Sequence, residues 1–306
     1  MNEVTPVATA QPKGERMRRR MDVLMRYAFA ATGSLTVVLL VGMFLFLLIN
    51  GFGTFTQVSL REFFFSADWN PSSAGTPRWG ILSLLLGTAM ISIGALAVAI
   101  PFGLALAIYL SQLAPQSLRE ILKPVIEMIA GIPSVVLGLL GLLYVAPLVS
   151  RTFGLSNGLN ALTASILVGI SAVPTIASLC EDALSGVSKR LNEASLALGA
   201  TRWTTIYKVL IPAAVSGIAA AIMLGLGRAI GETMVVLMVA GNSLAMPHSF
   251  LDPARPMTAT IAIEIREVVV GDLHWKSLFA VELVLFLITF LINSLTDIFI
   301  HKRHRL

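Results

Sequence analysis

The chain has 306 residues, of which 56% are hydrophobic and only 13% charged. Soluble domains carry about 25% charged residues, so this composition excludes an ordinary soluble protein. The apolar residues form blocks of the length that an α-helix needs to cross a bilayer, and these blocks are too continuously apolar for barrel strands. We therefore predict an all-α membrane protein with about six transmembrane helices, at roughly 27–50, 80–110, 122–148, 159–180, 209–241 and 276–300.

The first apolar block is predicted to be retained as a span. It follows a basic run between Lys13 and Arg20, but the stretch from Tyr27 to Ile49 is longer than the core of a signal peptide. Most of the 22 Lys and Arg residues lie in segments on the same side as the N-terminus. This bias predicts that both termini are cytoplasmic. It does not indicate nucleic-acid binding, because no separate basic domain is present.

Three parts are predicted along the chain. Residues 1–25 form an N-terminal tail, of which residues 1–12 are expected to be disordered. Residues 26–300 form the membrane domain, and residues 301–306 form a basic C-terminal tail. In the loops on the opposite side, Trp69 and Trp79 are expected at the membrane interface or in contact with an external partner. The apolar stretch that ends at Val270 predicts a short surface helix.

The loop at about 181–208 has the pattern of a projecting helix–Gly–helix element. Glu193 and Ala194 begin a helix-compatible run, and Gly199 permits a sharp bend because glycine tolerates positive φ. Residues 201–211, including Arg202, predict a second short helix, and Pro212 suits the first turn of the next span. A rigid element of this shape on the cytoplasmic side is suited to dock into a groove on a partner.

This spacing resembles the EAA motif of ABC importer permeases. The resemblance implies that the loop docks on an ATP-binding subunit, with Glu193, Ala194, Gly199 and Arg202 at the contact. The chain contains no G-x-x-x-x-G-K-[ST] stretch. We therefore predict that this chain is not an enzyme and holds no cofactor, and that a partner subunit binds ATP and Mg.

The fifth apolar block contains two charges, Arg228 and Glu232. Arg228 lies roughly 24 Å along a helix from Pro212, near the middle of the membrane, where a charge must face protein or water. Four residues separate Arg228 from Glu232, which predicts a shared helix face. Either the pair neutralises itself as a structural feature, or Arg228 attracts an anion whose tetrahedral oxygens match its guanidinium. Glu232 would then orient Arg228 or accept a hydrogen bond from a protonated oxyanion, with Thr233 nearby.

The stretch from Leu224 to Met234 resembles the PstC-type permeases of phosphate (Pst) ABC importers, and further matches are Met238–Asn242, Trp69-Asn70-Pro71 and Gly131-Ile132-Pro133-Ser134. The resemblance implies a type I ABC importer permease fold in a bacterial plasma (inner) membrane. It also implies phosphate as the substrate and a substrate pathway at Arg228 and Glu232. The implied partners are a second permease (PstA type), two ATP-binding subunits (PstB type) and an external phosphate-binding protein (PstS type).

Three alternatives remain open on sequence alone. They are an ABC permease for sulfate or molybdate, a proton-coupled secondary anion carrier, and a membrane scaffold that does not transport. Among other ionisable groups, Glu127 is expected to snorkel or to pair with Lys123 or Arg119, Glu282 to be structural or interfacial, and Asp297 to be solvated. Cys180 is expected to be a packing residue. The four histidines show no metal-ligand spacing, so no metal is predicted.

Overall fold

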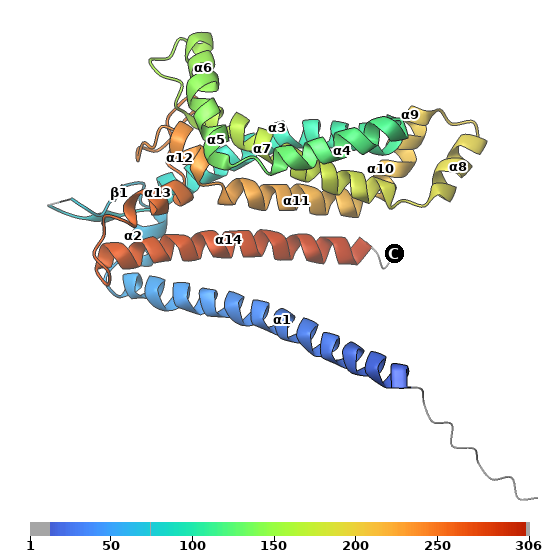
Figure 1. Cartoon of the computed structure of the whole chain (residues 1–306). Helices are drawn as coiled ribbons and strands as arrows, with labels where there is room; N and C mark the ends of the chain where they lie inside the picture. The colour runs from blue at the N-terminus through green and yellow to red at the C-terminus, as the bar shows by residue number, and fades with distance from the viewer. Residues whose placement is uncertain (1–12, 74, 304–306) are drawn as a thin grey trace, which may run out of the picture. The chain divides into compact units, whose positions relative to one another are not determined.

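The computed structural model describes residues 13–73 and 75–303, and the side chains among them from 21 to 294 (Figure 1). The predicted disorder of residues 1–12 and the side chain of Asp297 fall outside these ranges. The chain divides into two units, residues 1–49 and 50–306, which are described separately. Within the described part, five helices are long and apolar enough to cross a membrane, or six if one bent pair counts as a single span. The prediction of about six spans in an all-α membrane protein is confirmed.

The first unit consists of helix α1 (Lys13–Phe52), whose last three residues belong to the second unit. The helix begins within the segment predicted to be the N-terminal tail. Its apolar residues lie on every side of the helix, which is typical of a helix surrounded by lipid. The hydroxyls of Thr32 and Thr36 donate to carbonyls of the preceding turn, so their polar groups are satisfied within the helix.

The second unit is built around α3 (Leu82–Ile108) and α7 (Ala161–Ser185), which pack along each other. Small residues make this close approach possible. A Cβ added to Gly169 would lie only 2.8 Å from the carbonyl oxygen of Ala95. Helix α11 (Val215–Gly231) packs against both members of this pair, and α14 (Leu273–Arg303) packs against α11 and continues into the segment predicted to be the C-terminal tail.

The third apolar block is broken where one span was predicted at 122–148. A short π-helix η2 (Tyr109–Leu113) leads into the amphipathic helix α4 (Gln116–Ala130), which ends before Gly131-Ile132-Pro133. Proline at 133 disfavours helical backbone at the residue before it, so the chain restarts as α5 (Ser134–Leu140). This helix continues through η3 (Gly141–Val145) into α6 (Ala146–Phe153). The membrane-length helix is therefore 134–153, and α4 is a separate element.

The fifth block is broken twice. The loop before it forms α8 (Lys189–Ala197) and α9 (Arg202–Thr205), followed by η4 (Ile206–Leu210) and α10 (Ile211–Ala213). The segment 202–213 is bent by 72° against α11. After α11 the chain restarts as α12 (Met234–Val239). We call the end of the unit that carries α8 and α9 the coupling end (Figure 1).

The opposite end of the second unit is called here the hairpin end. It contains η1 (Gly53–Thr56), α2 (Leu60–Phe65), the antiparallel strands β1 (Trp69–Asn70) and β2 (Arg78–Trp79), and α13 (Met257–Glu264). Trp69 pairs with Trp79, and both side chains are buried in an apolar cluster with Phe63 and Met257. Because both side chains are buried, the alternative that these tryptophans contact an external partner is wrong, whereas their expected place at the membrane interface stays a prediction. The predicted surface helix is also wrong, because most of α13 is buried.

Candidate functional site: a membrane arginine and a projecting loop

Arg228 lies in the last turn of α11, and its side chain is exposed. Its Nη1 donates to Thr175 Oγ1 on α7 at 2.8 Å, and its Nη2 lies 3.5 Å from the carbonyl oxygen of Ala130, the last residue of α4. Both partners are neutral. Among the side chains that the structure describes, no ion pair involves Arg228, so its positive charge is not cancelled by a carboxylate.

Glu232 does not share a helix face with Arg228, because α11 ends at Gly231 and Glu232 is extended (φ −67°, ψ 120°). The predicted pair is therefore absent from the described part of the chain. One carboxylate oxygen of Glu232 instead accepts from the backbone N–H of Val235 at 3.3 Å, which caps the start of α12. Thr233 donates to the carbonyl of Gly231. Glu232 and Thr233 thus form the connection between two helices beside Arg228.

The first turn of α13 fastens this connection from the hairpin end. The hydroxyl of Thr258 donates to the carbonyl of Glu232 at 3.1 Å, and the backbone N–H of Met257 donates to Thr88 Oγ1 on α3 at 3.0 Å. Beyond α12, Gly241 has φ +86° and its missing Cβ leaves room for the carbonyl of Leu159. A glycine is needed there because both the positive φ and the close approach exclude a side chain.

The projecting element has the predicted helix–Gly–helix form. Helix α8 ends at Ala197, Gly199 has φ +83°, and α9 begins at Arg202 after the N-cap Thr201. Ser195 and Thr205 are joined by a hydrogen bond of 2.9 Å, which holds α8 against α9. Four predicted contact residues all lie on the exposed surface: Glu193, Ala194, Gly199 and Arg202.

Large apolar side chains are also exposed on this element. Leu198 is 90% exposed and Trp203 59%, and Leu191, Leu196 and Tyr207 lie around them. Exposed apolar side chains grouped on a projecting loop are typical of a protein-binding surface. The prediction from sequence named the polar residues and the glycine of this loop but missed these hydrophobic ones.

A cluster of charges joins α4 to α7 near the coupling end. Lys123 Nζ lies 2.7 Å from Glu181 and 3.0 Å from Asp182, and Arg119 also pairs with Glu181, whose side chain is 1% exposed. The hydrogen bonds that Lys123 donates, first the one to Glu181 and then the one to Asp182, raise the pKa of Lys123 above its usual range. Among the described side chains, the pairing that was one alternative for Glu127 is not seen, because Lys123 and Arg119 bond to α7 instead.

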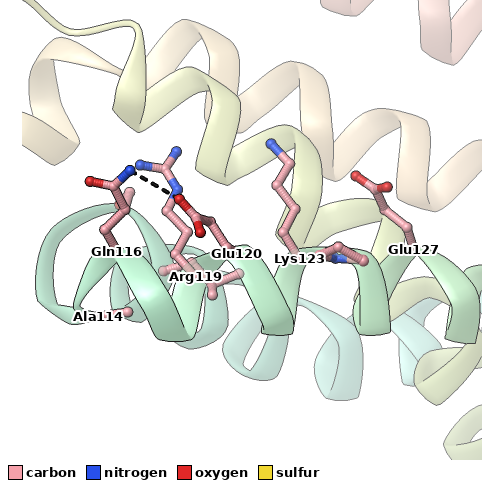
Figure 2. Close-up of a pocket in the computed structure, with 9 residues that line it drawn as sticks. Ala114, Gln116, Arg119, Glu120, Lys123 and Glu127 are labelled. Carbon is pink, nitrogen blue, oxygen red and sulfur yellow. Dashed lines mark hydrogen bonds between the residues drawn. The ribbon is translucent and has the colours of Figure 1, made fainter.

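A pocket of about 590 Å³ runs along the same side of α4 (Figure 2). Figure 2 shows Gln116, Arg119, Lys123 and Glu127 rising from one side of the helix, as their spacing of three and four residues requires. Gln116 also donates to Glu120. Because its two cations are already bonded to α7 and two carboxylates line it as well, the pocket has no excess of positive charge for an anion.

A buried polar network at the hairpin end was missed by sequence reasoning. Glu264 in α13 pairs with Arg255 Nη2 at 3.1 Å and contacts His274 Nε2 at 2.9 Å. It also accepts from Trp69 Nε1 at 3.0 Å. Burial lowers the pKa of Arg255, and nearby Glu264 and Glu267 oppose that shift. Trp69 lies 195 positions from Glu264, so no local pattern could have identified that partner.

Two further residues were singled out in the sequence, and the expectation for one of them, Cys180, is confirmed. Cys180 is a free and buried thiol within α7, which is typical of a packing residue. Glu282 is half-buried in α14, and among the described side chains it has no ion pair. In the same part of the chain, no group of three or more His, Cys, Asp or Glu residues is arranged to hold a metal ion.

Two relatives match almost the whole chain. A probable ABC transporter permease protein, YqgH of Bacillus subtilis, is 36% identical over 279 residues, which cover 90% of each chain. The phosphate transport system permease protein PstC of Mesorhizobium japonicum is 35% identical over 293 residues, which cover 90% of this chain and 88% of that protein.

Solved structures share the fold at lower identity. A bacterial ABC transporter involved in the import of the polysaccharide alginate has a TM-score of 0.62 at 14% identity, covering 93% of this chain and 99% of that one. The MetNI methionine ABC transporter has a TM-score of 0.53 at 22% identity, covering 73% and 94%. At these identities the likeness concerns the fold alone, and it confirms the predicted type I importer permease architecture.

A family model described as "binding-protein-dependent transport system inner membrane component" matches residues 99–305. This stretch includes α4, α7, the projecting element, α11, α12 and α13, but not the strands β1 and β2. Subunits of this family form the membrane part of an ABC transporter and are not themselves catalytic. The chain therefore belongs to the binding-protein-dependent transport system inner membrane components, as a PstC-type permease subunit of an ABC importer.

Proposed function

We propose that this chain is one of two permease subunits of an ATP-driven phosphate importer and forms half of the phosphate pathway. The observation that carries the proposal is the Arg228 guanidinium, which is exposed and has only neutral hydrogen-bond partners. A cation within the membrane that is not neutralised by a carboxylate attracts an anion, and the planar guanidinium matches two oxygens of a tetrahedral oxyanion. The phosphate-transport relatives support phosphate as that anion.

The roles of Glu232 and Thr233 follow from the break between α11 and α12. Helix α11 ends and α12 begins beside Arg228, so this part of the pathway can move without unwinding a continuous helix. Glu232 supports the break by capping α12, and its second carboxylate oxygen is the group that would accept a hydrogen bond from a protonated oxyanion. Hydrogen phosphate has that proton and sulfate does not, so Glu232→Gln is expected to reduce the preference for phosphate over sulfate.

The projecting element would receive the motion of the ATP-binding subunit. Its exposed apolar side chains and the rigid turn at Gly199 support docking into a groove of a partner. We assign the remaining parts of the importer as a second permease of the PstA type, two ATP-binding subunits of the PstB type that hold ATP and Mg, and a phosphate-binding protein of the PstS type. The charge bias of the loops supports cytoplasmic termini and a coupling loop on the cytoplasmic side of the bacterial inner membrane.

The deciding experiment measures ATP-dependent uptake of labelled phosphate by the assembled complex in liposomes. Arg228→Gln is compared with the native chain and with Arg151→Gln, an exposed arginine on α6 that serves as the matched control. Co-purification of the ATP-binding subunit establishes equal assembly. We expect uptake to be lost only in Arg228→Gln. Retained uptake would make Arg228 a structural charge.

The same system separates the alternative functions. Competition by sulfate or molybdate at equal concentration would indicate a different oxyanion. Uptake by this chain alone under a pH gradient, without ATP, would indicate a secondary carrier instead.

A further inference from the structure

Thr175 differs from several other threonines of the membrane helices in that its hydroxyl is not seen to donate within its own helix. Threonine within a helix usually donates to a carbonyl three or four residues earlier, as Thr88, Thr152 and Thr289 do. No such bond of Thr175 is seen in the part of the chain that the structure describes. Its Oγ1 instead accepts from Arg228 Nη1, which lies 53 positions away on another helix. The hydroxyl is thus used for a tertiary contact with the pathway arginine.

The two hydrogen bonds of Arg228 are unequal. The bond to Thr175 is 2.8 Å, whereas the contact of Nη2 with the Ala130 carbonyl is 3.5 Å. N–H···O bonds are commonly about 2.9–3.0 Å and weaken at longer distance. An anion that approaches Arg228 therefore replaces the Ala130 contact more easily than the Thr175 contact.

We propose that Thr175 is a positioning residue of the anion pathway, and that the Ala130 carbonyl is the resting acceptor that the anion replaces. This inference rests on the proposed function of Arg228. With Nη1 held by Thr175, the Nε and Nη2 donors remain as one edge of the guanidinium, and that edge can bind two oxygens of one oxyanion. Within the described residues, Nε has no hydrogen-bond partner.

The chemistry of threonine suits this role. Its hydroxyl is neutral, so it orients the guanidinium without cancelling the charge that attracts the anion. A carboxylate at the same place would form an ion pair and compete with phosphate. The β-branched side chain has few χ1 rotamers in a helix, so few other arrangements of the hydroxyl compete with the bond to Arg228.

The test measures the initial rate of ATP-dependent phosphate uptake by the complete complex in liposomes, with the phosphate-binding protein present. Thr175→Val removes the hydroxyl and keeps the shape, Thr175→Ser keeps the hydroxyl, and Thr289→Val is the matched control, because that hydroxyl bonds only within its own helix. We expect uptake by Thr175→Val to be about tenfold slower, because this variant loses one hydrogen bond to a charged group. We expect Thr175→Ser to recover most of the rate and Thr289→Val to match the native chain.

Melting temperature and co-purification of the ATP-binding subunit separate positioning from a structural role. We expect both to be unchanged in Thr175→Val. A slow variant with a lower melting temperature or poor assembly would overturn the positioning role, as would a serine variant as slow as the valine variant. Native uptake in Thr175→Val, with Arg228→Gln inactive, would overturn this inference and leave the proposed function intact. Native uptake in Arg228→Gln would overturn the pathway role of Arg228 and this inference with it, whereas absence of ATP-dependent phosphate uptake by the native complex would overturn the proposed function itself.

Discussion

The network around Glu264 makes a strong prediction about stability. Its carboxylate joins three segments at the hairpin end, because Trp69 lies on β1, Arg255 precedes α13, and His274 begins α14. Glu264 and Arg255 are each only 8% exposed. Glu264→Leu is therefore expected to leave the Arg255 charge buried without its partner.

The cost follows from that burial. Removing one partner of a buried ion pair costs about 3–5 kcal/mol, and the loss of the bond from Trp69 Nε1 adds about 1 kcal/mol. Burial lowers the pKa of Arg255, but an arginine stays protonated in proteins, so it cannot escape the penalty by losing its charge. The double variant Glu264→Leu with Arg255→Met removes both charges, and we expect it to recover most of the loss because an apolar pair of similar volume is often neutral.

The assay is thermal melting of the purified chain in lipid nanodiscs. For the single variant we expect a decrease on the order of 5–10 °C, with a much smaller decrease for the double variant. Glu62→Leu, an exposed carboxylate on α2, is the matched control and should change stability by less than about 0.5 kcal/mol. A Glu264→Leu variant that melts like the native chain would refute the reasoning, and so would a double variant no more stable than the single one.

Three other substitutions test the rest of the fold. Lys123→Met should lower the melting temperature equally at pH 7 and pH 9. Both pH values lie below the usual lysine pKa of about 10.4 and the folded-state pKa of Lys123 is higher still, so its contribution to stability is lost only as the pH rises through that folded-state pKa. A decrease that vanishes at pH 9 would contradict this. Gly199→Val should weaken co-purification of the ATP-binding subunit severalfold, because a β-branched residue is strained at φ +83°. The control Gly33→Val should not, because a side chain added at Gly33 on α1 meets open space. Gly169→Leu should sharply reduce the yield of folded protein, since its side chain would collide with the backbone of α3; native yield in detergent extracts would show that α3 and α7 can separate.

The membrane helices could be predicted from the sequence because long apolar blocks have few other physical solutions. The helix–Gly–helix loop could be predicted as well, since its glycine and its helix-compatible segments act locally. Arg228 and Glu232 were identifiable because charges in such blocks are costly and therefore rare. In each case the signal lies within a few residues of the feature that it predicts.

Only the tertiary structure decided how these parts meet. A hydropathy window averages over breaks of two or three residues, so the interruptions at Gly131–Pro133 and at Glu232–Thr233 were hidden in blocks that seemed continuous. The latter break removes the helix face that Arg228 and Glu232 were expected to share. The partner of Arg228 on α7 and the partners of Glu264 are set by which helices pack together. The contacts of Arg228 with Thr175 and of Glu264 with Trp69 join positions far apart in the chain, and their specificity comes from packing geometry that no local pattern contains.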